Sequence, residues 1–154
     1  LEDAELLDEA LAALSGFPPE RLCFSASIEN LGEHGFRRIQ SSFPGATLQC
    51  PIDFLCPMLP EASWYAREVL EMLGRWGVKR FSLSWNQPSV RRAFEQLCAW
   101  GHEVNLRDVP DFEGFLQAAL LLPRSLTARF DSPLWRGAER AAGRALGRTS
   151  VSAR

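Results

Sequence analysis

The chain has 154 residues, a formal net charge of −2 at pH 7 and 46% hydrophobic residues. This length allows one sizeable hydrophobic core, and the slightly acidic balance lacks the basic footprint of proteins that bind nucleic acid or anionic membranes. No apolar run approaches the ~20 residues of a membrane span, and the first residues do not read as a signal peptide. We therefore expect no nucleic-acid partner and no membrane span.

The first part of the chain predicts two helices and two strands. Helical spacing of apolar residues predicts a helix over residues 2–15. Residues 21–27 (RLCFSAS) read as a short strand, and Ser27 can cap a brief helix that starts near Ile28. Residues 46–52 (ATLQCPI) give a second strand, weakened by a proline that cannot donate to a ladder.

Residues 77–109 predict a complete strand, helix and strand unit, and a one-sided helix over residues 61–76 leads into it. Residues 78–85 and 103–109 alternate as strands, and Gly101 can close the helix between them in the left-handed conformation. One face of that helix carries Val90, Ala93, Phe94, Leu97 and Cys98. Because the connection is a helical crossover, we expect the two strands to be parallel neighbours.

The end of the chain predicts one more helix, one more strand and a polar tail. Asp111 is a plausible N-cap, and residues 125–130 (SLTARF) read as the last strand. The expected buried face of the helix carries Phe112, Phe115, Leu116, Ala119 and Leu120. Residues 136–154 are rich in arginine, glycine and serine, so we expect them to be a weakly ordered tail.

The spacing of these elements predicts an α/β fold. Five strands begin near residues 21, 46, 79, 103 and 125, which is typical of a (βα) barrel or a doubly wound sheet. A complete (βα)₈ barrel needs about 250 residues, so five units cannot close one. Residues 1–135 would then be the C-terminal part of a barrel whose front is missing, and the start at Leu1 instead of Met suggests a fragment, a processed chain or a trimmed one.

The four cysteines indicate a reducing environment. Cys23, Cys50, Cys56 and Cys98 form no CxxC pair. Cys23 and Cys98 lie within apolar patterns, so we expect mostly buried thiols and no disulfides. A cytoplasmic protein is therefore the expectation.

Three segments resemble the glycerophosphodiester phosphodiesterase family, a (βα)₈ barrel of the phosphatidylinositol-specific phospholipase C-like group. They are residues 23–27 (CFSAS), residues 101–111 (GHEVNLRDVPD) and residues 126–133 (LTARFDSP). The resemblance covers roughly residues 20–135, with Arg107 and Asp108 replacing a family Trp and Thr, and Thr127-Ala128 replacing a Thr-Asp pair. It implies a phosphodiester hydrolase whose histidine and carboxylate motifs lie in earlier strands.

The resemblance also implies where the catalytic groups would come from. No cofactor is expected within this chain, but the intact parent could hold Mg²⁺ or Ca²⁺, because phosphodiester hydrolysis needs charge neutralisation and a positioned acid or base. His34 reads as a surface turn between two glycines, and His102 with Glu103 precedes a strand at the end opposite to a barrel's catalytic rim. No catalytic residue and no metal ligand is assigned.

The candidate binding site consists of polar residues where the predicted strands end. In a barrel these ends meet at one rim. The residues expected there are Ser25, Ser27, Asp53, Ser84, Trp85, Arg107, Asp108, Thr127 and Arg129, and those assigned to substrate are Arg107, Trp85, Ser84, Ser27, Asp108 and Thr127.

Three of these residues have alternative roles. The planar fork of Arg107 could hold a phosphate or carboxylate, or it could form a salt bridge to Asp108 or Asp131. Trp85 could pack on the apolar part of a ligand or within the core. Asp53 is interpreted as a turn residue, and a ligand contact is its alternative.

Two classes of function follow from the sequence. The first is the C-terminal part of a hydrolase of glycerophosphodiester-like substrates, which is expected to be inactive as an isolated chain. The second is a non-catalytic α/β module that binds or regulates through the polar rim. Either would bind a small phosphorylated or anionic ligand, and either could self-associate through open sheet edges.

Overall fold

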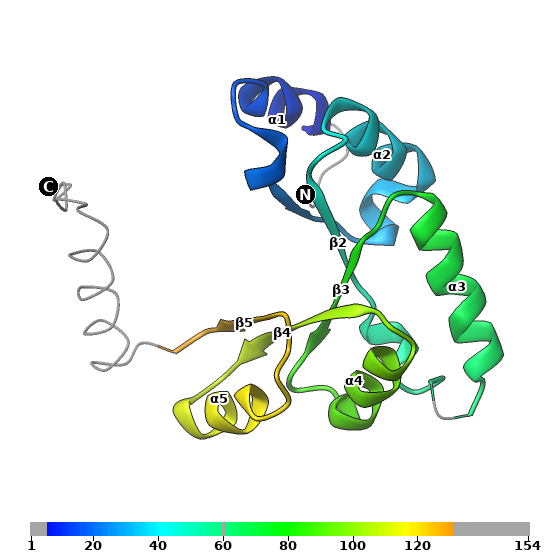
Figure 1. Ribbon diagram of the computed structural model, residues 1–154, viewed down its shortest axis with the longest axis vertical. Coiled ribbons are helices and arrows are strands. Elements are labelled where there is room, and N and C mark those ends of the chain that lie inside the picture. Colours follow the sequence, from blue (N-terminus) through cyan, green and yellow to red (C-terminus); the bar gives the residue numbers. More distant parts are fainter. Residues whose placement is uncertain (1–5, 60, 131–154) are drawn as a thin grey trace, which may run out of the picture.

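The computed structural model describes residues 6–59 and 61–130, which form one parallel sheet and the helices around it (Figure 1). The strands are β1 (Cys23–Ser25), β2 (Thr47–Pro51), β3 (Arg80–Ser84), β4 (Glu103–Val109) and β5 (Ser125–Ala128). The helices are α1 (Leu7–Leu14), α2 (Ile28–Ser42), α3 (Ser63–Arg75), α4 (Val90–Ala99) and α5 (Phe112–Ala119), with 3₁₀ turns η1 (Pro19–Arg21) and η2 (Asp53–Leu55).

The strands are parallel neighbours in the order β1-β2-β3-β4-β5. The sheet curls as half of a barrel, and the helices lie around its outer side (Figure 1). A doubly wound sheet would reverse its strand order at a switch point, and this order does not. The predicted partial (βα) barrel is therefore confirmed.

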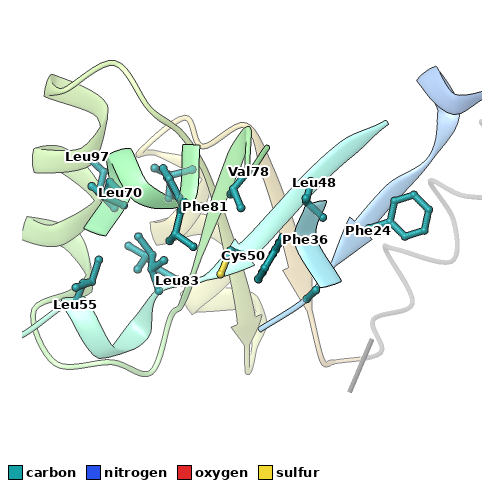
Figure 2. Packing of buried hydrophobic residues seen from close by; sticks show 14 of the residues in the cluster. Phe24, Phe36, Leu48, Cys50, Leu55, Leu70, Val78, Phe81, Leu83 and Leu97 are labelled. Carbon is teal, nitrogen blue, oxygen red and sulfur yellow. The ribbon is translucent and has the colours of Figure 1, made fainter. Parts of the chain in front are cut away.

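The two faces of the sheet differ in polarity because successive side chains of a strand alternate between them. The register places Ser82 beside Asn105 and Asn105 beside Ser125, so one face is polar across three strands. The other face contributes the buried core, and Figure 2 shows part of its packing against the helices. The apolar positions are Phe24, Leu48, Cys50, Phe81, Leu83, Val104 and Leu106. Parallel strands that are covered by helices on both faces are usually apolar throughout, so this alternation fits a sheet with helices on one face.

The predicted central unit is confirmed as β3, α4 and β4. The two strands pair in parallel over five positions, from Arg80 opposite Glu103 to Ser84 opposite Arg107. Gly101, with φ of +85°, follows the helix in the left-handed conformation, as expected for its end. The predicted helix face is buried at Val90, Ala93, Phe94 and Leu97.

Two expectations about cysteine were wrong. Cys23 and Cys98 are exposed, whereas Cys50 and Cys56 are buried. Cys98 follows the buried Leu97 and points away from the sheet, and Cys23 shares the polar face of the edge strand β1. Burial raises the pKa of the Cys50 thiol to about 12 and that of Cys56 to about 11. All four cysteines are free thiols.

The helix after Ser27 is longer than predicted and contains His34. It spans 15 residues, with a break at Gly32, where φ is +53°. The break supplies the turn, and the helix then continues because Phe36 and Ile39 are buried against the sheet. His34 is exposed, as the sequence suggested, but it lies in a helix and not in a turn.

The predicted buried face of α5 was wrong at Phe112, Leu116 and Leu120, whereas Phe115 is partly buried against the core. Gly114 and Ala118 are buried, whereas Phe112, Leu116 and Leu120 are 45%, 50% and 81% exposed. Small residues let the helix approach β4 and β5 closely, and β5 is the last strand of the sheet.

No helix among residues 6–59 and 61–130 is long and apolar enough to cross a bilayer. The predicted tail, residues 136–154, lies outside the described residues.

Candidate functional site

The C-terminal ends of the parallel strands lie at one end of the sheet, and four charged side chains meet there. They are Asp53 after β2, Arg107 and Asp108 near the end of β4, and Arg129 after β5. We call these four residues the rim network.

Arg107 occupies the centre of the rim network. One terminal nitrogen of its guanidinium, Nη2, pairs with Asp53 Oδ2, and the other, Nη1, pairs with Asp108 Oδ2. The three side chains are partly buried, with 30%, 18% and 14% of their surface exposed for Arg107, Asp53 and Asp108. The alternative of a salt bridge to Asp108 is therefore the observed one, while Asp131 lies outside the described residues.

Asp53 also connects three neighbouring strands. Its Oδ1 accepts a hydrogen bond of 2.6 Å from the backbone N–H of Ser84, so the carboxylate joins the ends of β2, β3 and β4. The residue does begin the short turn η2, as the sequence suggested. Its long-range pairing was missed because sequence alone does not say which charged strand ends will be neighbours. Aligning the predicted strands as consecutive parallel neighbours could have indicated that Asp53 and Arg107 lie close together.

Asp108 has a backbone conformation that non-glycine residues rarely adopt, with φ of +61°. The register between β4 and β5 shifts between Leu106 and Val109, so Asp108 lies in an irregular step of the ladder. Its carbonyl accepts a bond of 3.3 Å from Asn86 Nδ2, and its Oδ1 lies 2.7 Å from Arg129 Nη2. Strained residues of this kind are often found at functional sites, where surrounding contacts hold them in place.

Trp85, which follows β3, lines two surface hollows. One hollow, of about 260 Å³, is lined by Trp85, Asn86, Pro110, Asp111, Glu113, Gly114 and Gln117. The other, of about 350 Å³, is lined by Trp85, Ser89, Val90, Arg91 and Gln117. The Arg91 guanidinium carbon lies 5.4 Å from the centre of the indole, and α5 packs so closely that a Cβ at Gly114 would lie 3.1 Å from Trp85 Nε1. Trp85 is half-buried and lines both hollows.

The other predicted binding residues are less closely connected. Ser84 is buried at the end of β3, and its amide donates to Asp53. Ser27 is half-buried and precedes α2 without a side-chain cap bond, and Thr127 is exposed on the edge strand β5. The hydrogen bonds found among the described residues do not join Ser27 or Thr127 to the rim network.

His102 lies at the opposite end of the sheet, before β4. Its ring packs edge-to-face on Phe81, with ring centres 5.1 Å apart. Burial, and secondarily the charge of Arg67, lowers the pKa of His102, so the neutral ring is favoured. Within the described ranges, no group of three or more His, Cys, Asp or Glu side chains is placed to hold a metal ion.

The rim network has two carboxylates and two guanidinium groups, so its formal charges cancel. Arg107 Nε is buried without a hydrogen-bond partner in the described part of the chain, and both ends of its fork are bound. Arg129 is different, because its side chain is 74% exposed and contacts Asp108 through one nitrogen. An incoming anion could therefore reach Arg129 with less rearrangement than Arg107.

Comparison of the chain with protein-family models, curated protein sequences and solved structures gives no match.

Proposed function

We propose that this chain supplies the C-terminal strands of a (βα)₈-barrel hydrolase that acts on glycerophosphodiester-like substrates, and that its rim network binds the phosphate. The observation that carries the proposal is the gathering of Asp53, Arg107, Asp108 and Arg129 at the strand ends of a curled parallel sheet. In (βα) barrels this end of the sheet is where substrates bind.

The segments that resemble the phosphodiesterase family support the same location. Residues 101–111 contain β4 and end at Asp111, whose side chain accepts a bond from Gly114 N–H at the start of α5. Residues 23–27 contain β1. Both segments therefore lead to the end of the sheet that carries the rim network.

Within the proposal, the two arginines have different tasks. Arg129 contacts the phosphate, because it is exposed and has unused donors. Arg107 positions Asp53 and Asp108, because its terminal nitrogens are bound to them. Trp85 supplies an apolar wall at the adjacent strand end, and Ser84 holds Asp53 through its backbone N–H.

We further propose that the isolated chain binds its ligand without hydrolysing it. Turnover needs groups that respond to charge developing in the transition state, and one arginine that orients a phosphate does not provide them. In the intact parent, upstream strands would supply the acid, the base and a Mg²⁺ or Ca²⁺ ion. The free thiols favour a cytoplasmic location for this activity.

The test is calorimetric titration of the purified chain with glycerol 3-phosphate. We expect weak binding that Arg129→Ala reduces by about fivefold or more, since a charge-assisted contact is worth roughly 1 kcal/mol at an exposed site. Arg80→Ala is the matched control, because Arg80 pairs with Glu103 at 3.1 Å at the opposite end of the sheet. If Arg129→Ala binds glycerol 3-phosphate as tightly as the wild type, the proposed site is contradicted.

A parallel assay addresses hydrolysis. Release of the alcohol from a glycerophosphodiester is measured for the isolated chain with and without Mg²⁺ or Ca²⁺. No turnover is expected in either case. Metal-dependent turnover by these 154 residues would place the active site elsewhere.

The second candidate is a non-catalytic binding or regulatory module. The observation in its favour is the internal neutralisation of the rim network, which already satisfies both ends of the Arg107 fork. Ligand binding that persists in the longest natural form of the chain, without turnover, would select this candidate.

We also propose that the chain self-associates at the open edge of its sheet. β5 pairs only with β4 within the described sheet, and α5 beside it exposes Phe112, Leu116 and Leu120. Unpaired strand edges and exposed apolar faces are common sites of association. Sedimentation equilibrium should show a concentration-dependent mass that Leu116→Ser lowers, and a monomer at all concentrations would contradict this part.

A further inference from the structure

Exposed large apolar side chains are concentrated in the segment that joins β2 to α3 and in the first turn of α3. Ten such residues are found in the described part of the chain, and four of them fall between β2 and the first turn of α3. They are Phe54, Met58, Trp64 and Tyr65, which are 40%, 37%, 66% and 43% exposed. We call these four residues the aromatic lip. Single exposed apolar residues are ordinary, but a group of four with three aromatic rings indicates a binding surface.

The aromatic lip is continuous with the candidate site. Phe54 directly follows Asp53, which pairs with Arg107 in the rim network. The loop then continues to Ser63, where α3 begins (Figure 1). In a parallel sheet with helical crossovers, the N-terminal ends of the helices lie at the same end as the C-terminal ends of the strands. The lip and the rim network therefore lie at the same end of the sheet.

The charged side chains nearest the aromatic lip on α3 and just before it are Glu61, Arg67 and Glu68, so their balance is negative. Glu68 lies four residues after Trp64 and three after Tyr65, so it shares their side of α3, and Glu61 precedes the helix and is exposed. The guanidinium carbon of the exposed Arg67 lies 4.4 Å from the centre of the Trp100 ring, which draws this cation toward Trp100. The rings of Trp64 and Tyr65 stand edge-to-face, with centres 5.9 Å apart and planes at 78°. Two aromatic walls beside a carboxylate suit a quaternary ammonium group.

We propose that the aromatic lip docks the protein on the surface of zwitterionic, phosphocholine-bearing lipid assemblies. The outermost group of such a surface is a quaternary ammonium, which complements Glu68 and the faces of Trp64 and Tyr65. Trp and Tyr are also the side chains that favour the boundary between headgroups and acyl chains, since one end is apolar and the other polar. An anionic surface would instead be repelled by Glu61 and Glu68.

The docking would place the rim network against phosphodiester headgroups. This link to a lipid-borne substrate rests on the proposed phosphodiesterase function, whereas the docking itself does not. The exposed face of α5 is a less suitable lipid-docking surface, because its exposed positions are mainly leucine and the ammonium-binding combination of rings and carboxylate is found at the lip.

The experiment is co-sedimentation of the chain with sucrose-loaded phosphatidylcholine vesicles. The wild type is expected to sediment with these vesicles and to bind phosphatidylglycerol vesicles less. The double variant Trp64→Ala, Tyr65→Ala should lower the partition coefficient by about tenfold or more, because it removes most of the inserted apolar area. Both side chains are exposed, so a circular dichroism melting curve should confirm that the variant still folds.

The matched control is Phe17→Ala. Phe17 is an exposed aromatic residue, 57% accessible, that precedes β1 at the opposite end of the sheet. Its replacement should leave vesicle binding unchanged. The proposal is overturned if the wild type does not sediment, if Phe17→Ala lowers binding as much as the lip variant, or if anionic vesicles bind better.

The glycerol 3-phosphate titration separates this inference from the proposed function. The lip variant should bind glycerol 3-phosphate as the wild type does, because the rim network is intact. Arg129→Ala should still sediment with phosphatidylcholine vesicles. Loss of vesicle binding in Arg129→Ala would contradict docking by the lip, and failure of glycerol 3-phosphate binding alone would contradict the rim site and leave the lip in place.

Discussion

The β3–α4–β4 and β4–α5–β5 units have the same order of elements. They differ in how much of the apolar face of the helix is buried. Both have a parallel strand pair joined by a helix with apolar residues at helical spacing. In the first unit that face is buried, and Leu97 of α4 is 0% exposed. In the second unit Leu116 of α5 is 50% exposed.

The difference follows from position in the sheet. The first unit lies inside the half-barrel, with strands on both sides of it, whereas β5 is the edge of the described sheet. Helix α5 approaches the sheet through Gly114 and Ala118, and Phe112 and Phe115 pack edge-to-face on Phe130. Helical periodicity shows that a helix has an apolar stripe, but it does not show which neighbour covers the stripe.

The largest expected effect is the contrast between Leu97→Ala and Leu116→Ala. Leu97→Ala should lower the free energy of unfolding by about 3 kcal/mol, because it leaves a cavity against the sheet. Leu116→Ala should change it by less than about 0.5 kcal/mol, because that side chain is already half exposed. Urea denaturation of the two variants measures both values. Similar losses in both would show that α5 buries its apolar face in solution.

A smaller effect is expected at the rim network, whose central Arg107 lies on β4, the strand that the two units share. Arg107→Ala leaves Asp53 and Asp108 without the guanidinium between them, so the free energy of unfolding should fall by about 2 kcal/mol. The control is Arg37→Ala, which breaks an exposed ion pair of 2.7 Å with Glu33 one helical turn away. That change should cost less than about 0.5 kcal/mol. Equal costs in denaturant titrations would mean that the rim network does not stabilise the sheet.

The smallest effect concerns the start of α5. Asp111 Oδ1 accepts a hydrogen bond of 2.7 Å from Gly114 N–H, so Asp111→Ala should cost about 1 kcal/mol. Ser27 precedes α2 without such a bond, so Ser27→Ala should cost a few tenths of a kcal/mol at most. Thermal unfolding of both variants compares the caps. An unchanged melting temperature for Asp111→Ala would indicate that α5 is held by packing alone.

The central fold could be predicted because its signals are local. Gly101 marks a helix end and residues 103–109 alternate, so the parallel pair followed from the sequence. The cap at Asp111 was predicted for the same reason, and its side-chain bond is observed. These features depend on neighbours within a few residues.

The rest depends on contacts between distant residues. The pairing of Asp53 with Arg107 spans 54 positions, and it depends on strand order and register. The exposed face of α5 depends on the strand being at an edge, and the length of α2 depends on the burial of Phe36 and Ile39. The sequence predicted the end of the sheet at which Arg107 lies. It did not decide whether Arg107 would pair with Asp108 or Asp131, and it did not indicate the pairing with Asp53.

The most direct test of the rim site is a nuclear magnetic resonance titration of the isotopically labelled chain with glycerol 3-phosphate. We expect amide shifts at Asn86, Asp108 and Arg129, where the ligand would contact the rim network. Arg80 and Glu103, at the opposite end of the sheet, should not shift. Shifts confined to Arg80 and Glu103, or no shifts at millimolar ligand, would contradict the assignment of the binding site to the strand ends.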